Sequence, residues 1–133
     1  MDYNEENLNF VSDIIKKHLT ADLVPLKWSH KNRGNPMYGH CHTASGCLQK
    51  IFGTKEIKLY RALDDENIYH WWAVDKEGNI IDITADQYWS TKRKPPYLEG
   101  SKAGLLGFEY KKRVLKLLDK VTNQLHHRGT PLQ

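Results

Sequence analysis

Apolar residues recur at helical spacing in two long stretches of the chain. Between about residues 5 and 19, the apolar positions are Leu8, Val11, Ile14, Ile15 and Leu19. Between about residues 106 and 125, they are Tyr110, Val114, Leu117, Leu118, Val121 and Leu125. A repeat of three and four residues places such a set on one side of a helix. Both stretches are therefore predicted to form amphipathic helices with one buried face.

A shorter helix is predicted between Cys41 and Phe52. Its apolar stripe holds Cys41, Ala44, Leu48, Ile51 and Phe52. Residues 21–38, which precede it, show no periodicity and contain two prolines and a Gly-Asn pair, a composition typical of a loop. Cys41 would follow a turn at Gly39 and His40, and it would stand in the first helical turn, at the end of the buried face.

Between the helices, the pattern changes to the alternation expected of strands. The predicted strands are residues 56–62, 68–75 and 79–83. The last two are joined by a three-residue loop that ends in Gly78, and such a loop suits a hairpin in which Trp72 lies opposite Asp82. In this register His70 and Asp82 project from the same face as diagonal neighbours, close enough for a carboxylate-imidazole contact.

The segments after the hairpin are shorter or irregular. Thr84 and Gln87 fit a capping box that begins a short helical turn through Trp89. Residues 92–104 contain two prolines and two glycines and are predicted to form a loop. Residues 126–133 are predicted to be a frayed tail.

The predicted elements combine into an α+β fold. A small antiparallel sheet would pack on the helix that starts at Cys41, and the N- and C-terminal helices would complete the cover. With 133 residues, the chain is long enough for a single domain with one core. Within it we distinguish an N-terminal helix in residues 1–20, a core with the candidate site in residues 21–90, and a C-terminal basic helix in residues 105–125.

Composition limits the classes of protein that fit the chain. Apolar residues make up 39% and charged residues 27%, which is typical of a folded globular protein. No apolar run approaches the roughly 18 residues that span a bilayer, so no membrane association is expected. The acidic N-terminus differs from a secretory signal, which favours a cytoplasmic location. Cys41 and Cys47 would lie about 9 Å apart along one helix, too far for an unstrained disulfide.

Basic residues concentrate near the C-terminus. Residues 91–133 hold 10 basic and 3 acidic groups, whereas residues 1–90 hold 10 and 13. Lys112, Lys116 and Lys120 would share one exposed stripe of the last helix, and this stripe could attract an acidic macromolecular surface. Nucleic acid is disfavoured as a partner, because the stripe lacks the interleaved aromatic residues on which bases stack.

Three residues suggest nucleophilic chemistry when they are taken in order. A cysteine in a first helical turn faces the positive end of the helix dipole, which favours the nucleophilic thiolate. Cys41 would be the nucleophile, His70 the base that moves its proton, and Asp82 the carboxylate that orients His70. Each residue alone also has a structural explanation, since a free cysteine or a strand histidine is commonly part of a core.

The same residues carry a resemblance to a known family. Gly39-x-Cys41, His70-Trp71-Trp72 and Gly78-x-x-Ile81-Asp82-Ile83-Thr84 resemble the core motifs of the transglutaminase-like branch of papain-like enzymes. They are more similar still to the bacterial YunG-like family, over roughly Trp28 to Leu118. This resemblance implies a single papain-like domain over residues 1–133.

The resemblance also suggests residues for the oxyanion and the substrate. His40 stands where the YunG-like family usually has glutamine. The oxyanion donor is therefore open between the backbone N–H of Cys41, the ring of His40 and the indole of Trp28. The family's His-x-Trp strand and Asp-x-Thr-x-x-Gln strand end add Trp72 and Gln87 as further candidates.

The expected activity is acyl transfer at an amide through Cys41, His70 and Asp82, without a cofactor. Hydrolysis of a peptide or isopeptide bond, deamidation of a glutamine side chain and transfer to an amine remain open, and the expected substrate is a protein or peptide. The alternative is a catalytically inactive binding module that uses the same fold and the basic helix. A zinc site is disfavoured because its ligands would lack the usual paired spacing. The candidate zinc ligands would be His40, Cys41, His42, Cys47 and His70.

Overall fold

The computed structural model describes residues 1–104 and 108–127, and the side chains of 108, 109 and 127 are outside the description. The helices are α1 (Glu5–Lys17), α2 (Ser29–Gly34), α3 (Cys41–Phe52), α4 (Asp86–Trp89) and α5 (Phe108–His127). The strands are β1 (Ile57–Leu63), β2 (Tyr69–Asp75), β3 (Ile80–Ile81) and β4 (Ser101–Ala103). Short 3-10 turns are η1 (Ala21–Leu23), η2 (Leu26–Trp28) and η3 (Tyr97–Glu99).

The four strands form one antiparallel sheet in the order β3-β2-β1-β4. β1 and β2 pair along their whole length, from Ile57 opposite Asp75 to Leu63 opposite Tyr69. β3 continues the hairpin with Ala73 opposite Ile81, which is the register that the three-residue loop predicts. The predicted third strand is shorter than expected, however, because only two of its residues form ladder pairs.

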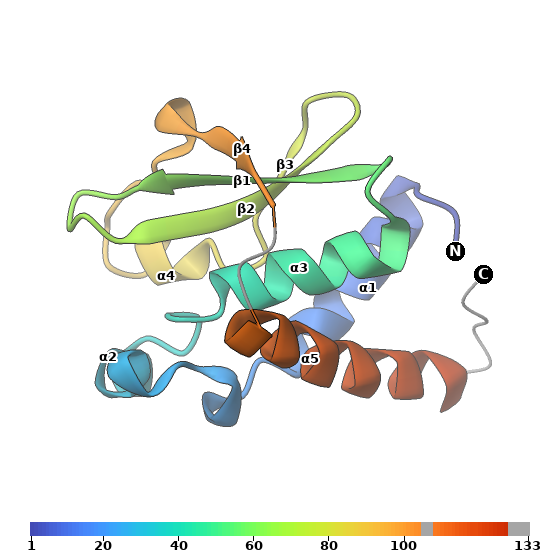
Figure 1. The fold of residues 1–133 in the computed structure, drawn as a ribbon, viewed down its shortest axis with the longest axis horizontal. Helices are drawn as coiled ribbons and strands as arrows, with labels where there is room; N and C mark the ends of the chain where they lie inside the picture. Colours follow the sequence, from blue (N-terminus) through green and yellow to red (C-terminus); the bar gives the residue numbers. More distant parts are fainter. Residues whose placement is uncertain (105–107, 128–133) are drawn as a thin grey trace.

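The core lies between one face of the sheet and a layer of helices. In Figure 1, α3 runs beneath the sheet, and α1 and α5 lie next to it on the same side. The amphipathic patterns account for this packing, because the apolar stripe of each helix is buried. The core side chains of α5 are Val114, Leu117, Val121 and Leu125, and all are fully buried. The predicted α+β fold, with a small antiparallel sheet covered by helices, is confirmed.

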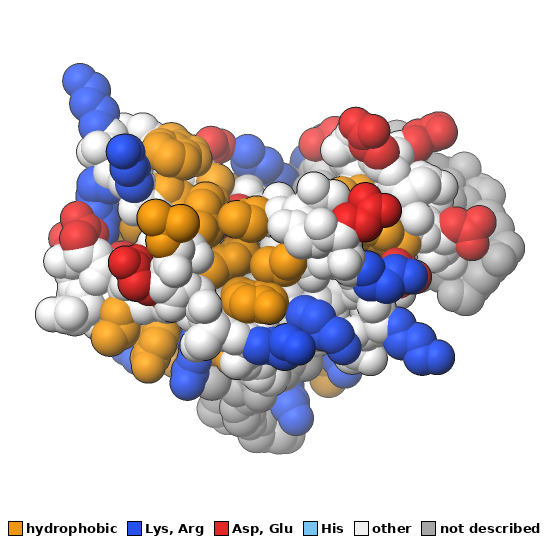
Figure 2. Space-filling view, turned by 90° about the horizontal axis from the view of Figure 1, so that it is seen from above, with side chains coloured by type: hydrophobic (Ala, Val, Ile, Leu, Met, Phe, Trp, Pro, Cys, Tyr) orange, Lys and Arg blue, Asp and Glu red, His pale blue; other side chains and the backbone are white. Residues whose placement is uncertain are grey.

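Among the described residues, no long helix covers the other face of the sheet. Figure 2 shows this face, where apolar side chains gather over the middle. The segment 92–104, predicted as a loop, covers part of it and contributes both η3 and β4. β4 pairs with β1. The prediction missed this strand because three residues are too short to show a period.

Three further predictions need correction. The predicted loop 21–38 contains α2 as well as η1 and η2. The capping box is wrong, because the N-cap of α4 is Ala85 and no side chain caps it. α5 continues through residues 126 and 127, which were expected to fray, while residues 106, 107 and 128–133 lie outside the described chain.

The stripe on α5 is present but partly neutralised. The side chains of Lys116 and Lys120 lie 3.0 and 3.8 Å from the Asp22 carboxylate of η1. Hydrogen bonds from Thr20 and Lys116 help to lower the pKa of Asp22 to about 2, so this carboxylate is charged at neutral pH. Lys112 is exposed. None of the described helices is long and apolar enough to cross a bilayer.

Candidate active site

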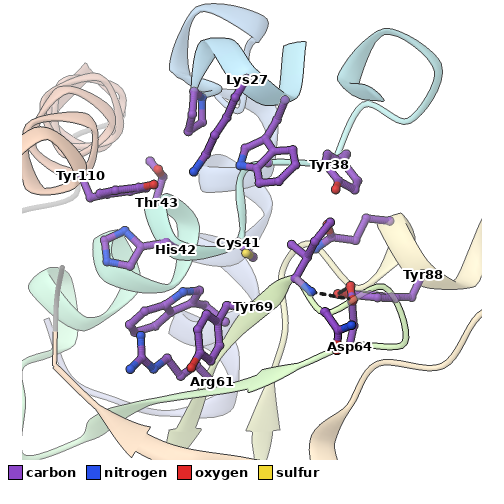
Figure 3. Close-up of a pocket in the computed structure, with 17 residues that line it drawn as sticks. Lys27, Tyr38, Cys41, His42, Thr43, Arg61, Asp64, Tyr69, Tyr88 and Tyr110 are labelled. Carbon is purple, nitrogen blue, oxygen red and sulfur yellow. Dashed lines mark hydrogen bonds between the residues drawn. The ribbon is translucent and has the colours of Figure 1, made fainter. Parts of the chain in front are cut away.

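Cys41 opens α3 at the wall of a cavity of about 280 Å³ (Figure 3). The turn before it depends on Gly39, which has a positive φ of 88°. A Cβ atom at Gly39 would also lie 2.7 Å from a methyl group of Val24, closer than packed atoms come. Glycine is therefore required both by the backbone conformation and by the close packing that delivers Cys41 to the cavity.

His70 connects Cys41 to Asp82. Its Nε2 atom lies 2.6 Å from a carboxylate oxygen of Asp82, and both side chains are almost fully buried. This is the diagonal contact that the hairpin register predicts. Burial acts to lower the pKa of His70, but hydrogen bonds with Asp82 and with the Cys41 side chain outweigh it and raise the pKa to about 9. The imidazolium form is thus stabilised between the thiol and the carboxylate.

Asp82 is itself held in place by hydroxyl groups. The Tyr97 hydroxyl donates to the same oxygen as His70, at 2.7 Å, and the Thr84 hydroxyl lies 3.4 Å from the other oxygen. Tyr97 belongs to the segment 92–104, which packs closely on the sheet, since a Cβ atom at Gly100 would lie 2.4 Å from the Trp72 ring. Tyr97 was not predicted as a site residue, because nothing in the sequence pattern of segment 92–104 indicates that it reaches Asp82.

Aromatic rings surround the imidazole of His70. Trp72 stacks beside it with ring centroids 5.8 Å apart, and Tyr88 meets it edge-on at 4.7 Å. Trp72 is only 1% exposed, and it lies behind His70 rather than on the cavity wall. The structure therefore gives Trp72 a place in packing the histidine and not the place in the cavity expected of a substrate-binding residue.

Gln87 reaches both the cavity and His70. Its side-chain nitrogen lies 3.1 Å from Nδ1 of His70 and donates to the Thr84 hydroxyl at 3.1 Å. With the amide in this orientation, the unprotonated Nδ1 accepts a hydrogen bond from Gln87, and Nε2–H donates to Asp82. With the amide turned over, its oxygen accepts from a protonated Nδ1. Gln87 can thus form a hydrogen bond with His70 in either protonation state of the imidazole.

The candidates for the oxyanion separate into two groups. Trp28 lines the cavity, and the N–H of Cys41 belongs to a first helical turn, where backbone donors have no partner within the helix. His40 is fully buried and does not line the cavity. Neither of its ring nitrogens has a hydrogen-bond partner among the described residues, and burial lowers its pKa to about 4. The structure therefore does not bring His40 to the site.

The cavity walls are mainly aromatic. Its rings are Trp28, Tyr38, Tyr69, Trp71, Tyr88 and Tyr110. His42 lies among them, edge-on to Trp71 at 4.7 Å and to Tyr110 at 5.5 Å. Burial lowers the pKa of His42 to about 4, so this ring is neutral and adds to the uncharged surface. The cavity suits a substrate with flat or apolar groups next to its reacting carbon.

The candidate zinc ligands do not converge. Cys47 lies in the core with no exposed surface, and burial raises its pKa to about 12. Within the described residues, no three histidine, cysteine, aspartate or glutamate side chains are placed to hold one ion.

Fold and site together define a class: an α+β protein in which a cysteine at a helix start lines an aromatic cavity and interacts with a buried histidine–aspartate pair. The chain belongs to the family described as YunG protein, whose model matches residues 8–126. This confirms the family that the motifs suggested. Comparison with curated proteins gave no match, and comparison with solved structures gave none either.

Proposed function

We propose that this protein is a cysteine-dependent enzyme that transfers the acyl group of an amide, and that it belongs to the transglutaminase-like branch of papain-like enzymes. The observation that carries the proposal is the position of His70. Its buried imidazole lies 2.6 Å from the Asp82 carboxylate, and interaction with the Cys41 side chain helps to raise its pKa. A nucleophile, a base and a group that orients the base are the parts that acyl transfer needs.

In the first half of the proposed reaction, the Cys41 proton passes to His70 and the sulfur attacks the carbonyl carbon of the amide. The electron pair of the C=O bond moves to oxygen, where the N–H of Cys41 and the indole N–H of Trp28 can stabilise the negative charge. The tetrahedral intermediate then collapses and breaks its C–N bond. His70 gives its proton to the departing nitrogen, which leaves as an amine, and the acyl group stays on Cys41 as a thioester.

In the second half, an acceptor attacks the thioester while His70 removes its proton. Cys41 leaves as a thiolate, and the protonated His70 remains beside Asp82. Water as acceptor gives hydrolysis, and an amine gives transfer. If the first substrate is a glutamine side chain, the departing amine is ammonia and hydrolysis amounts to deamidation. The three outcomes share every residue of the site, and a protein or peptide substrate fits all of them.

A panel of peptide-based electrophiles, read by intact mass, tests this proposal. We expect a single adduct on the wild-type protein, no adduct on Cys41→Ser, and full labelling of Cys47→Ala, which is the matched control on the same helix. Circular dichroism should show that all three proteins are folded. A folded wild-type protein that forms no adduct, or an adduct that persists in Cys41→Ser, would contradict the proposal and favour an inactive binding module.

A further inference from the structure

Two cationic side chains line the candidate cavity together with Cys41. Lys27 comes from η2, and Arg61 comes from β1. In Figure 3, Lys27 lies above and Arg61 lies below Cys41 and His42 in this view. Neither residue has a part in the Cys41–His70–Asp82 cluster, so their charges need a separate explanation.

No carboxylate of the described chain neutralises these two cations. Among the side chains that the structure describes, none forms an ion pair with Lys27 or Arg61. The acidic residue that lines the cavity is Asp64, and its oxygens are already used. They accept hydrogen bonds from the Tyr88 hydroxyl at 2.8 Å and from the backbone N–H groups of residues 66 and 68, and Arg93 lies 3.4 Å away. The described side chains that line the cavity therefore carry a net positive charge.

Aromatic rings hold the two cations in place. The Lys27 ammonium lies 5.1 Å from the centre of the Trp28 ring. The guanidinium carbon of Arg61 lies 4.3 Å from the centre of Tyr69 and 5.5 Å from that of Trp71. Stacking on a ring face fixes the plane of a guanidinium but leaves the N–H groups at its edge free to donate. Such a fixed fork matches the two oxygens of a carboxylate.

We propose that the acyl donor of this enzyme carries a carboxylate, which binds between Lys27 and Arg61 while the amide carbonyl lies at Cys41. This substrate class rests on the acyl-transfer function proposed above. The cavity volume of about 280 Å³ is close to the lower end for small-molecule pockets, about 300 Å³. The carboxylate therefore belongs to a residue next to the reacting amide, as its chain terminus or as its side chain.

Matched alkylating probes test this substrate class. N-Iodoacetyl-glycine and N-iodoacetyl-glycinamide differ only in a terminal carboxylate. N-Iodoacetyl-aspartate and N-iodoacetyl-asparagine, each with its α-carboxyl group converted to an amide, differ only in a side-chain carboxylate. In each reaction the Cys41 sulfur forms a C–S bond and iodide leaves, and intact mass gives the rate. We expect the acid to react at least about tenfold faster than its amide in one of the pairs. Added salt should reduce this preference.

Four variants connect that preference to the two cations. Lys27→Gln and Arg61→Gln should each bring the acid-to-amide rate ratio toward one. Lys58→Gln removes the same charge from an exposed position of β1 that does not line the cavity, so it should keep the wild-type ratio. Arg61→Lys retains the charge without the fork and should give an intermediate ratio, which also serves if Arg61→Gln does not fold.

The outcomes separate the two proposals. If Cys41 reacts with all four probes and both ratios are close to one, the carboxylate site is refuted while the acyl-transfer proposal stands. A preference that Lys58→Gln reduces as much as the cavity variants also refutes the site. If Cys41 reacts with none of the probes, the acyl-transfer proposal fails first. The pair that shows the preference identifies the carboxylate as terminal or side-chain.

Discussion

The two cysteines of α3 lie six residues apart on one helix but in opposite surroundings. Cys41, at the N-terminal end, is half-buried at an aromatic cavity and contacts His70. Cys47, in the middle of the helix, has no exposed surface, and burial raises its pKa to about 12. The same thiol is therefore placed as a nucleophile at one position and as a small core side chain at the other.

Two buried histidines repeat this contrast. His70 has Asp82, Cys41 and Gln87 as partners, and its pKa is raised to about 9. His40 stands directly before Cys41 in the sequence, but it has no hydrogen-bond partner among the described residues, and its pKa is lowered to about 4. Nearness in sequence to the candidate nucleophile is thus a poor guide, and the available partners decide which charge state is stable.

The largest expected effect follows from replacing the carboxylate that contacts His70. Asp82→Asn should reduce kcat by about 10⁴-fold, because the amide no longer favours the imidazolium or the correct tautomer. Steady-state kinetics with any amide substrate of the enzyme would measure this loss. Tyr97→Phe removes the hydroxyl group that donates a hydrogen bond to Asp82 but leaves the carboxylate in place. This variant should have a much smaller effect on kcat. An Asp82→Asn variant with more than a tenth of wild-type activity would show that His70 works without this partner.

An effect of intermediate size is expected from His40, on the stability of the fold at acidic pH. Its pKa is about 4 in the folded protein and about 6.5 in an unfolded chain, so the unfolded state binds more protons between these values. The resulting stability is present above about pH 6.5 and is lost as the pH falls toward 4. At pH 5 the loss is about 2 kcal/mol. His40→Met places an apolar side chain without a titrating group in the core. Between pH 7 and pH 5, its free energy of unfolding should therefore fall by about 2 kcal/mol less than that of wild type.

Urea unfolding at the two pH values would measure this difference, and His30→Met at an exposed position of α2 is the matched control. His42, whose pKa is also lowered to about 4 by burial, stays in both variants and should leave part of the acid sensitivity in place. The same pH dependence in His40→Met and wild type would mean that His40 is not buried in its neutral form.

The smallest effect concerns the packing of the two thiols. Cys47→Ala removes a sulfur atom from the core and should lower the free energy of unfolding by about 1 kcal/mol. Cys41→Ala changes a half-buried side chain at a cavity wall and should cost less than about 0.5 kcal/mol. Urea unfolding curves of both variants provide the comparison. The reverse order would place Cys41, and not Cys47, in the core.

The sequence predicted those features that repeat locally along the chain. The helical periods located α1, α3 and α5, and the length of the loop ending at Gly78 set the register that joins His70 to Asp82. These features depend on residues that are close in sequence. The order of cysteine, histidine and aspartate along the chain was therefore enough to predict that the histidine and the aspartate lie together.

The features that were missed depend on contacts between distant parts of the chain. Tyr97 reaches Asp82 because β4 pairs with β1 and Gly100 lies against Trp72, and none of these contacts produces a period. The orientation of His40 was missed for a related reason. His40 follows a turn with a positive φ at Gly39 and points into the core, and no periodic pattern in the sequence predicts this direction.

The most direct test of the account is the rate at which iodoacetamide alkylates each cysteine at about pH 6. A free thiol without help is mostly protonated and slow at this pH. Peptide mapping by mass spectrometry after short exposures would follow the two sites separately, and the urea-unfolded protein would serve as the reference in which both thiols are equivalent. We expect Cys41 to react at least about 100-fold faster than Cys47 in the folded protein. Equal rates for the two cysteines in the folded protein would contradict the assignment of Cys41 as the nucleophile.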